Sequence, residues 1–272
     1  MSGLRESAKQ ALPQPVLHGL RDSRDAIQRW AQWPSATLDP RRRDSIERLV
    51  ALKDSRKGER CFIIGNGPSL KQMDLSPLKN ENTIGMNRFY LMFPELGFKT
   101  TYFVSINDLV VEQCAADLQE LDIPTFISWR GRQWVQPRKE LYYLFTTYTG
   151  PKFATDIRGR LWEGATVTYV SMQIAFHLGF QQVILIGVDH NFATKGKPNT
   201  TVVSQGDDPN HFSGNYFGKG FRWQLPDLDT SEQGYIRARE AYREAGREIL
   251  DATVGGKLTV YPKVEFASLF KS

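Results

Sequence analysis

The 272-residue sequence is poor in cysteine and contains no long apolar run. Its two cysteines, Cys61 and Cys114, lie far apart in apolar surroundings. This favours buried thiols in a reducing compartment over a disulfide or a metal site. No apolar run approaches the roughly 18–20 residues that a membrane span needs. The first ten residues hold no apolar segment, so we expect no secretory signal peptide and a cytoplasmic location.

A strong charge imbalance is also lacking, since the net charge is +5 with 40% hydrophobic and 24% charged residues. Much of the excess lies in "DPRRRDSIERLVALKDSRKGER", where acidic residues interleave the basic ones. We interpret this segment as a solvated helical face, with peripheral contact at the inner face of the membrane as the alternative. No zinc finger, helix-turn-helix or aromatic RNA-binding motif is present, so we expect no nucleic-acid partner.

Residues 1–57 predict an N-terminal helical extension made of two helices that break near Pro34 and Pro40. Ile27, Trp30 and Trp33 share an apolar face of the first helix. We expect the extension to pack on the main domain. It is also a candidate surface for homo-oligomer formation or for membrane docking.

Residues 58–272 predict an α/β domain with a mostly parallel sheet and helices on both of its faces. The expected strands are the apolar runs "CFIIG", "NTIGMN", "TTYFVSIN", "PTFISW" and "QVILIGVD". The strongest helix covers residues 164–180 and ends near Gly179. A last helix over residues 230–253, capped by Thr230 or Ser231, and a strand at 257–262 complete the expected elements.

Residues 193–228 interrupt this alternation, with little periodicity, many glycines, prolines and asparagines, and several aromatic residues. A stretch of this length without regular structure is usually a functional lid or a disordered insertion. The aromatic side chains favour a lid that packs on something over a disordered insertion.

Ligands of open α/β sheets bind beyond the carboxyl ends of the strands, and here those ends are polar and rich in asparagine. Amides donate and accept hydrogen bonds, so they suit a sugar, a ribose or a base edge better than a bare metal ion. The strand ends carry Gly65, Asn66, Gly67, Ser69, Asn87, Asn107, Asp108, Arg130, Asp189, His190 and Asn191.

The turn "GNGPS" after the first strand is either a phosphate-cradling loop or a tight corner that needs glycine. It lacks the Lys-Ser/Thr ending of a P-loop and the third glycine of the dinucleotide fingerprint. His211, in the lid, is a candidate general base. Asp189 and His190 end the most apolar strand, where they either contact substrate or only cap the strand.

The motifs "IIGNGPSL", "GMNRFY", "VSIND" and "GATVTYVSMQIAFHLGFQQVILIGVDHNF" resemble, in order and spacing, the bacterial sialyltransferases of glycosyltransferase family 42. They are at least as similar to the related domain of Maf-type flagellin glycosyltransferases and 6-hydroxymethylpterin diphosphokinases. The resemblance covers roughly residues 60–270. It implies a Rossmann-like, GT-A-like fold.

By this resemblance the protein is a glycosyltransferase of surface-glycan, lipopolysaccharide or flagellin assembly. It would use a CMP-linked sialic acid or a related nonulosonic or Kdo-type sugar and transfer it to a glycan, lipid-linked glycan or protein acceptor. No metal or other cofactor would be required. The residues implied to bind the nucleotide are Gly65, Asn66, Gly67, Ser69, Asn87, Asn107, Thr166 and Thr168.

The sequence departs from the family pattern at its catalytic positions. The family's catalytic histidine aligns with Asn215, and a tyrosine that contacts the leaving phosphate falls near Asn191. These departures leave His211, His190, Asp189, Tyr216 and Lys219 as the candidates for the catalytic, phosphate-contacting and lid roles.

Two other functions remain open. A 6-hydroxymethylpterin diphosphokinase would move a pyrophosphoryl group from ATP and need Mg²⁺, for which the strand ends offer only Asp108 and Asp189 as carboxylates. A non-catalytic binding module would explain the unmatched histidine and the added N-terminal helices.

Overall fold

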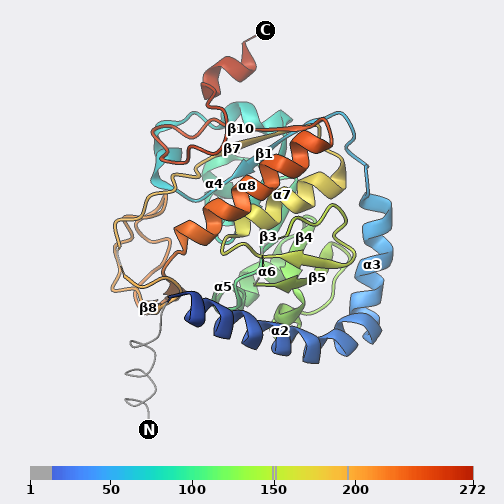
Figure 1. Ribbon diagram of the computed structural model, residues 1–272. Coiled ribbons are helices and arrows are strands. Elements are labelled where there is room, and N and C mark those ends of the chain that lie inside the picture. Colours follow the sequence, from blue (N-terminus) through green and yellow to red (C-terminus); the bar gives the residue numbers. More distant parts are fainter. Residues whose placement is uncertain (1–13, 149, 151, 195, 272) are drawn as a thin grey trace.

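The computed structural model describes residues 14–148, 150, 152–194 and 196–271. Its centre is an eight-stranded, wholly parallel sheet in the order β10-β7-β1-β2-β3-β4-β5-β6. The expected α/β, Rossmann-like fold is therefore confirmed (Figure 1). The strands are β1 (Arg60–Ile64), β2 (Asn82–Met86), β3 (Tyr102–Ser105), β4 (Thr125–Ser128), β5 (Leu141–Thr147), β6 (Arg160–Trp162), β7 (Gln182–Ile186) and β10 (Glu248–Asp251).

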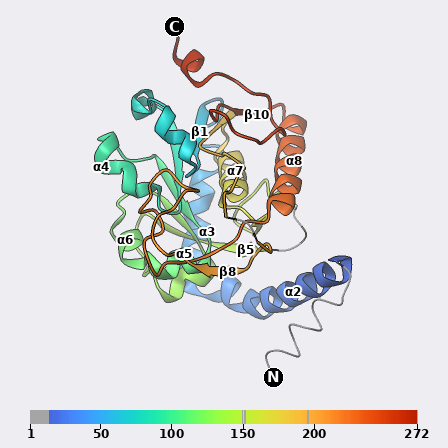
Figure 2. The ribbon, with the colours of Figure 1, turned by 90° about the vertical axis from the view of Figure 1, so that its left-hand side faces the viewer.

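Helices cover both faces of the sheet, because alternate strand residues bury their side chains in one of two apolar cores. One core packs β1–β5 and β7 against α3 (Pro40–Leu52), α7 (Val167–Leu178) and α8 (Leu228–Glu244). The other packs the opposite face against α5 (Asp108–Gln113), α6 (Ala115–Glu120) and the lid aromatics. The short α4 (Phe93–Leu96) lies on that same side (Figure 2). Both cysteines are buried and free, as expected.

The N-terminal helices differ from the expectation at Pro34. Helix α2 (Gln14–Leu38) continues through this proline, and only Asp39 separates it from α3. One lost backbone hydrogen bond does not end the helix here, because its last turns are held by the domain: Ala36 is buried, and the Trp129 indole donates to Ser35 Oγ. Helix α3 packs on β5 by burying Leu49.

The expected elements at the C-terminal end are wrong in two places. Residues 248–251, expected in the last helix, form strand β10, because α8 ends at Glu244 and Gly246 has a positive φ of 69°. Residues 257–262 are not a strand, although Leu258 and Tyr261 are buried in the core. The cap of α8 is Asp227 rather than Thr230 or Ser231, since its carboxylate accepts from the Thr230 amide.

The segment 193–228 folds over the carboxyl ends of the strands. Its two short strands, β8 (Thr201–Val203) and β9 (Arg222–Gln224), form an antiparallel ribbon. In Figure 2 its loops face the viewer, between α8 on one side and α4 and α6 on the other. Most of its aromatic side chains are buried: Phe212, Tyr216, Phe217 and Trp223. The segment therefore packs on the domain through these aromatic side chains.

Candidate functional site

The chain leaves the neighbouring strands β1 and β7 in opposite directions, toward β2 and toward β10. Such a switch point opens a crevice at the carboxyl ends of the strands. A pocket of about 600 Å³ lies there. Its lining includes the expected site residues Gly65, Asn66, Gly67, Asn87, Asn107, Thr166, Thr168, Asp189, His190, Asn191 and His211.

The turn after β1 lies against the end of β7. The Gly65 amide donates to the Ile186 carbonyl (2.7 Å) and the Gly67 amide to the Gly187 carbonyl (2.9 Å). A Cβ on Gly65 would lie 2.1 Å from the Gly187 oxygen, so glycine is required for this approach. Because the end of β7 and the residue after it already accept from both amides, the turn does not offer them to a phosphate.

Asp189 closes this corner from the side of β7. Its carboxylate accepts from the Ser69 hydroxyl (2.7 Å) and from the Ser69 amide (3.3 Å). Burial raises the pKa of Asp189, and the two hydrogen bonds from Ser69 act in the opposite direction. Ser69 itself is buried and does not line the pocket. It positions Asp189.

Residues with unfavourable positive φ angles cluster around the pocket. Among the described residues, five other than glycine have positive φ, and four of these line it: Asn87 (55°), Ala165 (57°), His190 (51°) and Asn199 (64°). The left-handed region is unfavourable for a residue with a Cβ, and such residues cluster at functional sites. The conformations therefore mark this pocket, independently of residue chemistry, as the candidate functional site.

The three asparagines at the strand ends have different surroundings. Asn66 donates to the Met86 carbonyl (3.2 Å), while its own side-chain oxygen is buried without a hydrogen-bond partner among the described residues. Asn107 caps α5 and donates to Gln224 of the lid. The Asn87 side-chain oxygen accepts from the Ser105 hydroxyl (3.5 Å). The Asn66 oxygen is thus a buried acceptor in the wall of the pocket that no described group satisfies.

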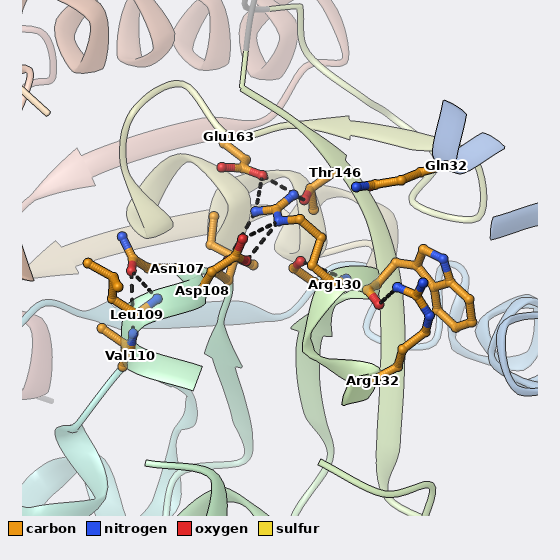
Figure 3. Close-up of polar contacts among 12 residues, drawn as sticks. Gln32, Asn107, Asp108, Leu109, Val110, Arg130, Arg132, Thr146 and Glu163 are labelled. Atoms are coloured by element: carbon orange, nitrogen blue, oxygen red, sulfur yellow. Dashed lines mark hydrogen bonds and ion pairs between the residues drawn. The ribbon is translucent and has the colours of Figure 1, made fainter. Parts of the chain in front are cut away.

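One wall of the pocket is held by Arg130, which follows β4 (Figure 3). Its guanidinium pairs with Asp108 (2.7 Å) and with Glu163 (2.9 Å), and it also donates to Thr146. Burial raises the pKa of Asp108, and Arg130 opposes this shift. The nearby Arg132 instead donates to the Trp129 carbonyl, and its guanidinium lies over the Trp129 ring.

The amino end of α7 forms part of the pocket wall. The Thr166 side chain caps this helix at the Thr168 amide, and Thr166, Val167 and Thr168 all line the pocket. The twelve-residue helix therefore directs the positive end of its dipole toward a bound ligand.

In the lid, His211 and Asp208 form an acid–imidazole pair. Nδ1 of His211 lies 2.8 Å from a carboxylate oxygen of Asp208, whose side chain is 4% exposed. The imidazole stacks on Tyr216 with 4.0 Å between ring centres and 5° between planes. No hydrogen bond engages Nε2 among the described residues, so this nitrogen remains for a ligand in the pocket that His211 lines. The lid is also joined to the opening turn, since the Phe212 amide donates to the Asn66 carbonyl (2.8 Å).

The other expected lid residues lie apart from the pocket. Tyr216 is fully buried, and its hydroxyl accepts from the Arg88 amide. Asn215 and Lys219 are exposed and do not line the pocket. His190 does line it, 3.7 Å from Glu232, and burial lowers its pKa.

The sequence reasoning missed several side chains that line the pocket or orient those that do. Asp208 could have been found, because an acid three residues before a histidine can reach its ring within one turn. Arg29 comes from α2 and Glu163 from the segment after β6, and no local pattern links either to the strand ends. Two acids lie at the start of α8: Asp227, which caps the helix and lines the pocket, and Asp229, which is exposed.

Fold and pocket together define an α/β protein of the Rossmann-like class with a candidate ligand site at the β1–β7 switch point. The sequence model of the 6-hydroxymethylpterin diphosphokinase MptE-like family matches residues 41–195. This is more than half of the chain, which therefore belongs to that family. The match confirms this part of the resemblance. None of the curated proteins compared with the chain matches it.

Among solved structures, the chain is similar to the Maf glycosyltransferase from Magnetospirillum magneticum AMB-1, with 18% identity and a TM-score of 0.49. That alignment covers 83% of this chain but 38% of the Maf chain, so this chain spans well under half of that protein. It is also similar to a mammalian sialyltransferase in complex with Gal-beta-1-3GalNAc-ortho-nitrophenol, with 12% identity and a TM-score of 0.37 over 86% of each chain.

Proposed function

We propose that the protein is a glycosyltransferase that takes a nucleotide-activated sugar in the switch-point pocket. The observation that carries the proposal is the His211–Asp208 pair, which the lid holds over that pocket. Asp208 fixes the imidazole through Nδ1, and Nε2 is then positioned to accept a proton. The unsatisfied Asn66 oxygen and the amino end of α7 add an acceptor and a positive dipole for the donor.

In this reaction an acceptor hydroxyl attacks the anomeric carbon of the donor sugar. Its proton moves to Nε2 of His211 as the new carbon–oxygen bond forms. The bond from the anomeric carbon to the phosphate oxygen breaks, and the nucleotide leaves with the electron pair. The α7 amino end and the hydroxyls of Thr166 and Thr168 stabilise the negative charge that develops on the phosphate.

A CMP-linked acidic sugar is the first donor to test, because the motif resemblance points to it. The arginines that line the pocket are already neutralised: Arg29 pairs with Asp25, and Arg130 pairs with Asp108 and Glu163. A donor carboxylate would therefore be bound by hydroxyl and amide groups. Because no arginine among the described pocket residues is left to bind a carboxylate, UDP donors that carry an uncharged sugar belong in the same screen.

The decisive experiment combines ligand binding with product formation. Thermal shifts with CMP, CDP, UDP, GDP and ATP, with and without Mg²⁺, identify the nucleotide. In transfer assays with the matching sugar donor, His211→Ala should lower kcat by about 10²–10⁴-fold. Asp208→Asn should lower kcat by a smaller factor, and Asp207→Asn, at an exposed neighbouring acid, should leave it unchanged. Binding of no nucleotide would contradict the proposal. Nucleotide binding without transfer would indicate a binding module.

The family match favours one alternative, pyrophosphoryl transfer from ATP to a hydroxymethylpterin. This reaction needs Mg²⁺, which prefers free carboxylate oxygens. The pocket does not fit this requirement well, since Arg130 engages Asp108 and Glu163 while Ser69 engages Asp189. No cluster of three metal-ligating side chains occurs in the described part of the chain. Mg²⁺-dependent release of AMP from ATP with the pterin would establish this alternative instead.

A further inference from the structure

Helix α2 is amphipathic, yet it turns its apolar side away from the protein. Its exposed apolar side chains, here called the α2 stripe, are Ile27 (68% exposed), Trp30 (78%), Trp33 (54%) and Leu38 (70%). They are four of the eight large hydrophobic side chains that are exposed among the described residues. Contiguous exposed apolar surface of this kind marks an interaction site.

The opposite side of α2 is polar and faces the domain. Asp25 and Arg29 are both buried and form an ion pair. Asp25 also accepts from the Thr147 hydroxyl (2.7 Å) and the Tyr148 amide (3.2 Å). Ile27 and Leu38 lie eleven residues apart, three turns along one side, while Trp30 and Trp33 are rotated from Ile27 by about 60° and 120° around the helix axis. Hydrogen bonds from Thr147 and Tyr148 of the domain to Asp25 thus hold the helix with its tryptophans outward.

We propose that the α2 stripe docks onto an anionic membrane surface. Tryptophan is enriched at the interface between headgroups and acyl chains, where its amphipathic ring is stabilised. An interfacial helix combines such an apolar side with flanking basic residues. Arg24 on α2 and Arg43 at the start of α3 are exposed and form no ion pair with the described residues. The net charge of the chain is +5.

A second copy of the chain fits the stripe less well. A stable interface buries about 800 Å² on each partner with about 20–30 residues. Four side chains along one helix are fewer than such an interface uses. The helix also lies along one outer side of the molecule, drawn in blue in Figures 1 and 2, where it can lie flat on a surface. No helix of the described residues is long and apolar enough to cross a bilayer, so the contact would be peripheral.

Docking through α2 would bring the pocket to the membrane, because Arg29 on the opposite side of the same helix lines the pocket. This step rests on the proposed function and specifies its acceptor as a glycan carried by a lipid. Vesicle binding is measured without donor or acceptor. Failure to bind vesicles is therefore distinguishable from failure of the glycosyltransferase proposal.

The full chain is tested by co-sedimentation with vesicles of phosphatidylcholine alone and of phosphatidylcholine mixed with phosphatidylglycerol. We expect binding to the mixed vesicles, weakened by salt, and a blue shift of tryptophan emission. The double variant Trp30→Ala/Trp33→Ala should weaken the binding about tenfold or more with an unchanged Tm. The control, Leu91→Ala/Val254→Ala, removes exposed apolar side chains elsewhere and should bind as the wild type does.

Three results would overturn the proposal. One is the absence of binding to either kind of vesicle. Another is equal loss of binding in the control variant. The third is a concentration-dependent dimer in sedimentation that the double tryptophan variant abolishes, since this would assign the stripe to a second copy.

Discussion

Gly65 shows how a single residue fixes the geometry of the site. A Cβ there would meet the backbone of Gly187, which directly follows strand β7 of the central sheet. We expect Gly65→Ala to lower the free energy of unfolding by about 1–3 kcal/mol through overpacking. Chemical denaturation measures this loss. Gly159→Ala is the control, because nothing lies within 4 Å of its added carbon, and an equal loss there would contradict the explanation.

The carboxyl of Asp189 gives a pH-dependent prediction. Because burial raises its pKa above the ordinary value of 3.8, the native state binds this proton more tightly than the unfolded chain does. As the pH rises from about 3.8 through the native-state pKa, ionisation of this carboxyl is less favourable in the folded protein than in the unfolded chain. The free energy of unfolding therefore falls over this range. We expect Asp189→Asn to unfold at higher denaturant concentration than the wild type at pH 7, with a smaller difference near pH 4.

The control for this prediction is Asp229→Asn, at an exposed acid. Its effect on stability should be small at both pH values. A variant Asp189→Asn that is less stable than the wild type at pH 7 would mean that the hydrogen bonds from Ser69 outweigh the cost of burial.

At the scale of elements, the start of α8 links a helix to the lid. Asp227 caps α8 at the Thr230 amide and also accepts from Asn199, which lies just before β8. We expect Asp227→Ala to destabilise the protein by about 1 kcal/mol and to expose the lid to limited proteolysis. Asp229→Ala, in the same helical turn but exposed, should change little. Equal protease sensitivity of the two variants would show that the cap does not hold the lid.

Elements with a strong local pattern were predictable. Five apolar runs became strands, and α7 ends at Leu178, just before Gly179, whose φ of 97° needs glycine. Strand β5 was missed although its leucine, tyrosine and phenylalanine residues are typical of a buried strand. Strand β10 was missed because it joins the sheet through β7, a contact between distant segments. The sequence also did not show which side of α2 faces the domain, since here the polar side packs on it and the apolar side is exposed.

At the scale of the whole molecule, Arg130 binds side chains from three separate segments at the sheet edge: Asp108, Thr146 and Glu163. Removing it leaves the carboxylates of Asp108 and Glu163 without their cation. We expect Arg130→Met to cost about 2–3 kcal/mol at pH 7, below the value for fully buried pairs because Asp108 is partly exposed. The loss should shrink near pH 4, because burial raises the pKa of Asp108 and protonation of its carboxyl removes one of the charges that Arg130 pairs with. Denaturation at the two pH values measures this.

Arg132→Met is the matched control, because Arg132 lies in the same turn and forms no ion pair with the described residues. It loses its contact with the Trp129 ring and one hydrogen bond. Its cost should be about 1 kcal/mol or less and independent of pH between 4 and 7. A loss equal to that of Arg130→Met would contradict the role of the network.

The sequence by itself determined the alternation of strands and helices, the glycine turn after β1 and the polar strand ends, because each depends on residues adjacent in the chain. Only the tertiary structure decided that the turn's amides are taken by β7 and that Asp208 orients His211. Only it, too, showed that the tryptophans of α2 point outward. These features depend on contacts between segments far apart in the chain or on which side of a helix finds a partner, and no local pattern encodes either.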